Sequence, residues 1–145
     1  MKLSFTKMNG AGNDFVMVDN RARALALTQA QIALACDRHR GVGADGLLLV
    51  EPSEGAPADF RMRYYNSDGG EAEMCGNGAR CFARFVQKLG GCRERVAFQT
   101  PAGLIRAELD GPLVRVNLSA PAGLRLKEKV KLSVGETEIS SLNTG

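Results

Sequence analysis

The feature that most constrains the fold is one strongly amphipathic segment, residues 77–89, set among strand-like segments. Its apolar side chains recur at the spacing i, i+3, i+4, i+7, which predicts a helix with one face toward a core. They are Phe82, Phe85, Val86 and Leu89. The opposite, narrower stripe is polar and holds Arg80, Arg84, Gln87 and Lys88. Because so wide an apolar surface needs cover on several sides, we expect a sheet to wrap around this helix.

Strand-like segments occupy much of the remaining chain. Apolar or alternating patterns predict strands at residues 3–7, 15–18, 46–51, 59–65, 96–100, 104–109 and 113–118, with a last hairpin near Gly135. Glycines and asparagines in residues 8–14 predict a loop, and Thr28 with Gln31 predicts a capped helix that ends near Cys36. No β-helix-β rhythm is evident. We therefore predict an α+β domain, a mainly antiparallel sheet or barrel wrapped around a central helix.

Composition restricts the function classes. The 145 residues suffice for one domain with a sizeable core, and 44% hydrophobic with 24% charged residues is typical of soluble globular proteins. No apolar run approaches the roughly 18 residues that span a bilayer, and the first residues do not resemble a signal peptide. We therefore expect a cytoplasmic protein without a membrane partner. The net charge of +3 is scattered and aromatic residues make up only 6%, which disfavours a nucleic-acid partner.

The chain has four cysteines, at positions 36, 75, 81 and 92, and a single histidine, His39. None of the cysteines forms a C-x-x-C pair, so the usual zinc spacings are absent and we expect no metal site. Cys36, Cys81 and Cys92 are interpreted as small core residues, since free cysteine is among the most buried residue types. A redox pair of Cys75 with Cys81 is disfavoured, because six residues along a helix is about 600° and the two side chains would diverge.

Cys75 differs from the other cysteines because Gly-Asn-Gly follows it at the predicted helix start. Two glycines there expose free backbone N–H groups and let a ligand approach closely. These groups and the positive end of the helix dipole suit a carboxylate, and the same field favours a thiolate. A thiolate could attack a carbonyl with a histidine partner, or act as general base toward a carbon acid. The second reaction needs no metal, and inversion of the carbon would need a second acid on its opposite face.

Four segments resemble the diaminopimelate epimerase family. They are MNGAGNDF (residues 8–15), CDRHRGVGADG (36–46), YYNSDGGEAEMCGNGARCFARF (64–85) and TPAG (100–103). The resemblance implies interconversion of LL- and meso-diaminopimelate, in lysine and peptidoglycan-precursor synthesis, without pyridoxal phosphate or another cofactor. In this family two cysteines flank the α-carbon of the substrate, one as thiolate base and one as thiol acid.

The resemblance also assigns site residues. Cys75 matches the first catalytic cysteine, and Gly76 with Asn77 matches the residues that bind the α-carboxylate or amine of the substrate. Asn13 and Asn66 match two further substrate contacts; without the resemblance they could be a loop cap and a turn residue. Some members carry glutamine where this chain has Gly46, so that side-chain contact is missing or supplied elsewhere. His39 receives no role.

The family has two similar halves with the substrate between them, and the second catalytic cysteine belongs to the second half. Residues 1–145 are therefore interpreted as the N-terminal half-domain, with the end (SSLNTG, 140–145) as the start of the interdomain segment and without a final strand. The expected partners are diaminopimelate and the missing C-terminal half-domain, with a homodimer through the exposed interdomain face as a further expectation. Two alternatives stay open: a proline- or hydroxyproline-type racemase, and a truncated non-catalytic half-domain that only folds or dimerises.

Overall fold

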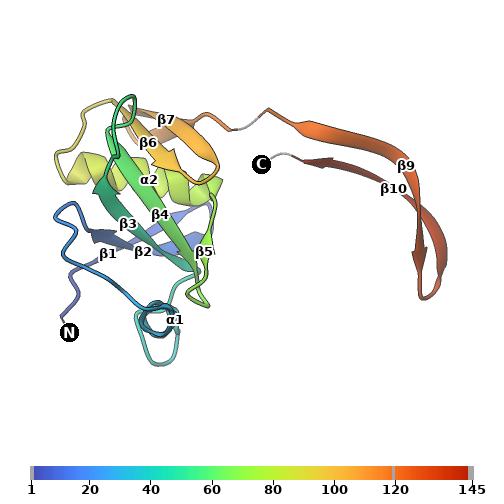
Figure 1. Cartoon of the computed structure of the whole chain (residues 1–145), viewed down its shortest axis with the longest axis horizontal. Helices are drawn as coiled ribbons and strands as arrows, with labels where there is room; N and C mark the ends of the chain where they lie inside the picture. Colours follow the sequence, from blue (N-terminus) through green and yellow to red (C-terminus); the bar gives the residue numbers. More distant parts are fainter. Residues whose placement is uncertain (1, 119, 144–145) are drawn as a thin grey trace.

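A computed structural model describes residues 2–118 and 120–143 (Figure 1). Among them the element order is β1 (Thr6–Gly10), β2 (Asn13–Asp19), α1 (Gln29–Cys36), β3 (Gly46–Pro52), β4 (Phe60–Asn66), β5 (Glu71–Ala72), α2 (Gly76–Lys88), β6 (Arg95–Thr100), β7 (Gly103–Asp110), β8 (Leu113–Val116), β9 (Ala122–Leu132) and β10 (Gly135–Asn143). The first eight strands form one sheet in the order β1-β2-β3-β4-β6-β7-β8, and the short β5 pairs with β4. Neither described helix is long and apolar enough to cross a bilayer.

The sheet curls around α2, as the sequence predicts. Both edge strands, β1 and β8, contact α2, and so do β2, β3, β4 and β7 between them. A flat sheet could not bring its two edges to the same helix, so the sheet is a partial barrel with α2 in its concave side (Figure 1). The expected apolar face is confirmed: Phe82, Phe85 and Val86 are buried, and Leu89 packs against the same core from a partly exposed position.

The ends of α2 follow from local sequence. Cys75 is the N-cap, and Leu89 is the C-cap. After it, Gly90 has φ +73, its N–H donates to the carbonyl of Gln87, and the Gly91 N–H donates to the carbonyl of Val86. This is the Schellman arrangement, in which glycine supplies the left-handed residue that ends a helix. The capping box at the start of α1 is also confirmed, because the side chains of Thr28 and Gln31 bond each other's backbone N–H.

Two strand pairs are parallel, which the sequence did not predict. β2 pairs with β3 in parallel and β4 pairs with β6 in parallel, whereas every other described pair is antiparallel. α1 lies in the connection between β2 and β3, and α2 lies in that between β4 and β6. Parallel neighbours need such long crossovers. The prediction of an α+β, mainly antiparallel fold is confirmed, but the expectation of no β-helix-β unit is wrong.

The predicted loop at residues 8–14 is largely strand. β1 continues to Gly10 and β2 begins at Asn13, so only Ala11 and Gly12 connect them. Both have positive φ, +53 and +96, as a two-residue type I′ hairpin requires. The glycine and asparagine signal therefore marked a tight turn within a longer hairpin. The hairpin places Asn13 at the first position of β2.

β9 and β10 form a separate two-stranded sheet that extends away from the curled sheet (Figure 1). The predicted turn near Gly135 is confirmed, since Gly135 pairs with Leu132 across it. β10 continues to Asn143, so the expectation that the chain lacks a final strand is wrong. Residues 144 and 145 of the expected interdomain segment lie outside the described residues. Large apolar side chains on this hairpin are exposed: Leu124, Leu126, Leu132, Val134, Ile139 and Leu142.

Candidate active site

The candidate site lies at one end of three neighbouring strands, β2, β3 and β4. Asn13 opens β2, Gly46 opens β3, and Asn66 closes the antiparallel β4. Strand register brings these ends together, because Gly46 is the partner of both Phe15 in β2 and Asn66 in β4. The start of α2 lies over the same end: a Cβ atom on Gly78 would lie 3.6 Å from both Phe15 and Leu48. The fold thus gathers residues that are far apart in the sequence.

Cys75 is positioned by the first turn of α2. Its backbone is extended, its carbonyl accepts the Ala79 N–H at 2.7 Å, and its Sγ accepts the Gly78 N–H at 3.4 Å. The thiol is half-buried, and all four cysteines of the chain are free. The N–H groups of Gly76 and Asn77 belong to the same first turn, where a helix offers no carbonyl partner. The Cys75 sulfur and these backbone N–H donors therefore lie next to each other. Such an arrangement suits a base that removes a proton from carbon beside a binding site for a carboxylate.

Asn77 and Asn13 contact each other directly. The Asn77 Nδ2 donates to the Asn13 Oδ1 at 2.6 Å, and the Asn13 Nδ2 donates to the Asp45 Oδ2 at 3.1 Å. At the other end Arg80, one turn along α2, donates to the Asn77 Oδ1. Four side chains therefore form one continuous hydrogen-bond chain, from Arg80 through Asn77 and Asn13 to Asp45. It joins the start of α2 to the starts of β2 and β3.

A network of charges supports the strand side of this chain. Arg38 donates to Asp45 at 2.9 Å and to both carboxylate oxygens of Asp14. The backbone N–H groups of Asp14 and Asp45 donate to each other's carboxylates, and the Lys7 Nζ lies 3.0 Å from the Asp14 Oδ2. The Arg38 and Lys7 cations hold the pKa of Asp14 well below its usual range. The network fixes the two backbone segments that carry Asn13 and Asp45.

Asn66 belongs to the same end of the sheet through Tyr64. The Tyr64 hydroxyl donates to the Asn66 Oδ1 at 2.8 Å, and the Tyr64 ring packs edge-to-face on Phe15 at 6.1 Å between centroids. Burial is the main cause that raises the pKa of Tyr64. Asn66 itself is exposed. Asn66 therefore offers an exposed amide whose oxygen accepts the Tyr64 hydroxyl.

Gly46 has no space for a side chain. A Cβ atom there would lie 2.5 Å from the Tyr65 carbonyl oxygen and 2.7 Å from the Tyr64 ring. The Tyr64 ring thus occupies the space next to position 46, and its hydroxyl supplies a polar group at this end of the sheet. A glutamine at position 46 would displace the tyrosine.

The remaining cysteines and the histidine lie outside the site. Burial raises the pKa of Cys36 to about 11, and it also raises the pKa of Cys81 and of Cys92. Cys36 and Cys81 are buried in the two apolar clusters of the core, as expected. His39 is exposed in the loop after α1, where its backbone N–H donates to Asp37. No group of three His, Cys, Asp or Glu side chains among the described residues is placed to hold a metal ion.

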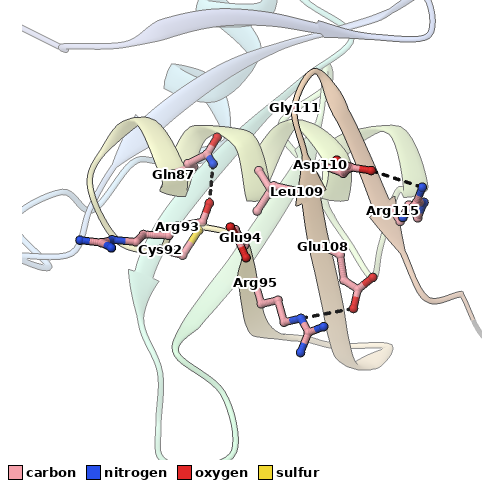
Figure 2. A pocket seen from close by; sticks show the side chains of 10 residues that line it. All are labelled: Gln87, Cys92, Arg93, Glu94, Arg95, Glu108, Leu109, Asp110, Gly111 and Arg115. Carbon is pink, nitrogen blue, oxygen red and sulfur yellow. Dashed lines mark hydrogen bonds and ion pairs between the residues drawn. The ribbon is translucent and has the colours of Figure 1, made fainter.

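A surface hollow near the other end of α2 is a separate feature (Figure 2). It is lined by Gln87, Cys92, Arg93, Glu94, Arg95, Glu108, Leu109, Asp110, Gly111 and Arg115. Four of its charged side chains form ion pairs, Arg95 with Glu108 at 3.4 Å and Arg115 with Asp110 at 3.5 Å. None of the candidate site residues lines it, so the hollow is not the predicted site.

The sequence model of the diaminopimelate epimerase family matches residues 5–121 of this chain. The chain belongs to the diaminopimelate epimerase family. It is 54% identical over 124 residues to a diaminopimelate epimerase of Burkholderia ambifaria, covering 83% of this chain and 43% of the relative. It is 49% identical over 123 residues to the diaminopimelate epimerase of Chromobacterium violaceum, covering 83% of this chain and 45% of the relative. The chain therefore spans less than half the length of these curated relatives.

Solved structures show the same fold in other members of this structural class. The chain superposes on a probable proline racemase from Agrobacterium radiobacter with a TM-score of 0.71 and 14% identity, covering 97% of this chain and 49% of that one. A hydroxyproline epimerase from Agrobacterium vitis superposes with a TM-score of 0.70 and 14% identity, covering 95% of this chain and 48% of that one. A phenazine biosynthesis protein from Bacillus anthracis superposes with a TM-score of 0.60 and 23% identity, covering 88% of this chain and 42% of that one. At such identities the likeness concerns the fold alone.

Three further residues within the family motifs contact the candidate site, although the sequence alone assigns them no role. Asp45 lies in GVGADG, Arg80 in CGNGARC, and Tyr64 is the first residue of YYNSDG. Each bonds one of the predicted asparagines. Their side-chain types gave no signal by themselves, because an exposed Asp or Arg is more often solvated. Only their position within the diaminopimelate epimerase motifs could have suggested a role.

Proposed function

We propose that this chain is the half of a diaminopimelate epimerase that supplies one of two catalytic cysteines. Cys75 takes or gives the α-proton, while Asn13, Asn66, Gly76 and Asn77 hold the substrate. The reaction interconverts LL- and meso-diaminopimelate without pyridoxal phosphate, and it belongs to lysine and peptidoglycan-precursor synthesis in the cytoplasm. The observation that carries the proposal is the Cys75 thiol at the N-cap of α2, beside the bonded pair Asn13 and Asn77.

The chemistry follows from this placement. A thiolate at the helix start removes the α-proton from one face of the substrate carbon, and the negative charge spreads into the α-carboxylate. The N–H groups of Gly76 and Asn77 and the dipole of α2 stabilise that charge. A proton must then arrive from the opposite face, and that acid is the thiol of a second half-domain. In the reverse direction the two sulfurs exchange roles.

The two similar halves are part of the proposal. The chain covers 43% and 45% of the two relatives in Burkholderia and Chromobacterium, which leaves length for a second domain of comparable size. The exposed apolar residues of the β9–β10 hairpin support contact with a further domain or with a second copy of the chain. The isolated chain should therefore bind substrate weakly and should not invert it.

A chimera tests this function. Residues 5–121, the segment that matches the family model, would replace the corresponding part of the Burkholderia ambifaria relative. We expect the chimera to convert LL- to meso-diaminopimelate and to exchange the α-proton with solvent deuterium. Cys75→Ala should abolish both, whereas Cys81→Ala should keep them. Conversion by the isolated chain, or by the Cys75→Ala chimera, would contradict the proposal.

A proline-type racemase is the weaker alternative. Its support is fold likeness at 14% identity, whereas the relatives at 54% and 49% are diaminopimelate epimerases. Offering L-proline to the same chimera decides between them: racemisation of proline without conversion of diaminopimelate would reverse our assignment.

A further inference from the structure

We infer that Asp45 and Arg80 are positioning residues that fix the orientation of two site amides, so that the site presents N–H donors and selects a carboxylate. This inference rests on the proposed function for the nature of the ligand. It concerns the four-residue hydrogen-bond chain Arg80, Asn77, Asn13 and Asp45. Asp45 and Arg80 are the two ends of this hydrogen-bond chain.

The two ends of the hydrogen-bond chain have fixed and opposite polarity. The Arg80 guanidinium only donates hydrogen bonds, and an ionised Asp45 carboxylate only accepts them. Arg80 therefore requires the oxygen of Asn77 to face it, and Asp45 requires the nitrogen of Asn13 to face it. With both ends set, the contact at 2.6 Å must run from the Asn77 Nδ2 to the Asn13 Oδ1. An asparagine amide alone has no such preference, because its oxygen and nitrogen are nearly the same size.

The consequence is a fixed direction for each amide. Asn13 and Asn77 each use one lone pair of the amide oxygen and one N–H within the hydrogen-bond chain, which leaves one N–H of each Nδ2 for a ligand. Asn66 follows the same rule, since the Tyr64 hydroxyl occupies its oxygen. The N–H groups of the first turn of α2 add further donors. The N–H groups that remain on the three amides and in the first turn of α2 are donors for the two oxygens of a carboxylate.

Partial burial strengthens the preference of the Asn13 and Asn77 amides for one orientation. Asn13, Asn77, Arg80 and Asp45 are all half-buried. Water competes less for their bonds than at the surface, and a reversed amide would put two oxygens or two N–H groups face to face. That mismatch costs more where the groups are partly desolvated. Arg38, which bonds Asp45 and Asp14, keeps the acceptor end in place.

Hydrogen exchange in the free chain tests the positioning role without any ligand. Nuclear magnetic resonance measures how fast the Nδ2 protons of Asn13 and Asn77 exchange with solvent. In the Asp45→Asn and Arg80→Met variants this exchange should be about tenfold faster than in the wild type. Arg80→Lys keeps a donor and should restore slow exchange. Asp19→Asn and Arg84→Met are matched controls: Asp19 pairs with Arg21, and Arg84 bonds the carbonyls at residues 111 and 113. Unchanged exchange in folded Asp45→Asn and Arg80→Met would overturn the inference.

Titration with glutarate, a simple dicarboxylate, separates positioning from plain charge. Removing the negative Asp45 should tighten glutarate binding if charge alone acted, and removing the positive Arg80 should weaken it. The inference predicts that both variants bind glutarate about tenfold more weakly, because both release the amides. Tighter binding by Asp45→Asn would overturn it. If the wild type shows no glutarate-induced change in its amide chemical shifts, carboxylate selection is overturned. The exchange rates then still decide the role of Asp45 and Arg80, and the chimera decides the proposed function.

Discussion

The Nδ2 of Asn77 lies 2.6 Å from the Oδ1 of Asn13, although the two residues are 64 positions apart in the sequence. This contact joins the first turn of α2 to the first residue of β2. It therefore fixes how the Cys75 thiol stands relative to the strand ends that carry the other candidate site residues.

The Asn13–Asn77 bond should contribute measurably to folding. We expect the free energies of unfolding of Asn13→Ala, Asn77→Ala and the double variant to show a coupling of about 1 kcal/mol. Either single substitution already removes the hydrogen bond, so the double variant does not lose it a second time. Urea denaturation measures the coupling. Strictly additive losses in the double variant would show that the two side chains do not act together.

Thiol reactivity should single out Cys75. Cys36 and Cys81 are buried, and burial raises their pKa values, for Cys36 to about 11. Alkylation of the native chain near neutral pH should modify Cys75 first and these two only after unfolding. Peptide mass mapping over a pH series gives the order, with Cys75→Ala as the control for the fastest phase. Equal rates at all four cysteines would argue against an activated thiol at the helix start.

Gly46→Ala should destabilise the fold by about 1–3 kcal/mol, because the added methyl group overpacks the site. It would meet the Tyr65 carbonyl oxygen at 2.5 Å and the Tyr64 ring at 2.7 Å. The matched control is Gly76→Ala in the first turn of α2, where the nearest atom is the Leu118 Cδ2 at an ordinary 3.6 Å. Thermal unfolding of both variants checks the contrast, and equal stability of the two would refute it.

Asp14 should make stability depend on acid pH. Its pKa in the folded chain is depressed, first by Arg38 and then by Lys7, below the ordinary value of 3.8. The ionised form therefore stabilises the fold fully above about pH 4, and this contribution is lost as the pH falls through the folded pKa. In Asp14→Asn the stability deficit relative to wild type should be constant near neutral pH and shrink in acid. The exposed Asp110→Asn serves as control; a deficit independent of pH would contradict the expectation.

Phe82 anchors α2 inside the curled sheet. Its side chain is fully buried and its ring lies 4.6 Å from that of Phe98 in β6. Phe82→Ala should cost about 3–5 kcal/mol of the free energy of unfolding through lost burial and the cavity left behind. Phe5→Ala, at a side chain that is 45% exposed, should cost far less. Denaturant titration compares them, and similar losses would mean that α2 is not the centre of the core.

Much of the fold could be read from the sequence because its signals are local. The i, i+3, i+4, i+7 spacing of Phe82, Phe85, Val86 and Leu89 predicts both the helix and its core face, and Thr28 with Gln31 predicts the start of α1. The strand directions could not be read. Whether β3 runs parallel or antiparallel to β2 depends on where the crossover through α1 returns the chain, and no residue pattern within either strand records that.

By itself, the sequence determined the short-range features of the site: a thiol at a helix start, free N–H groups after it, and family motifs that name Asn13, Asn66 and Asn77. The tertiary structure alone decided the partners of these groups. Asp45, Tyr64 and Arg80 bond the three asparagines because strand register and the curl of the sheet bring them within hydrogen-bond distance. The physical reason is that an amide has no inherent direction: neighbours of fixed polarity, supplied by the fold, decide whether it donates or accepts.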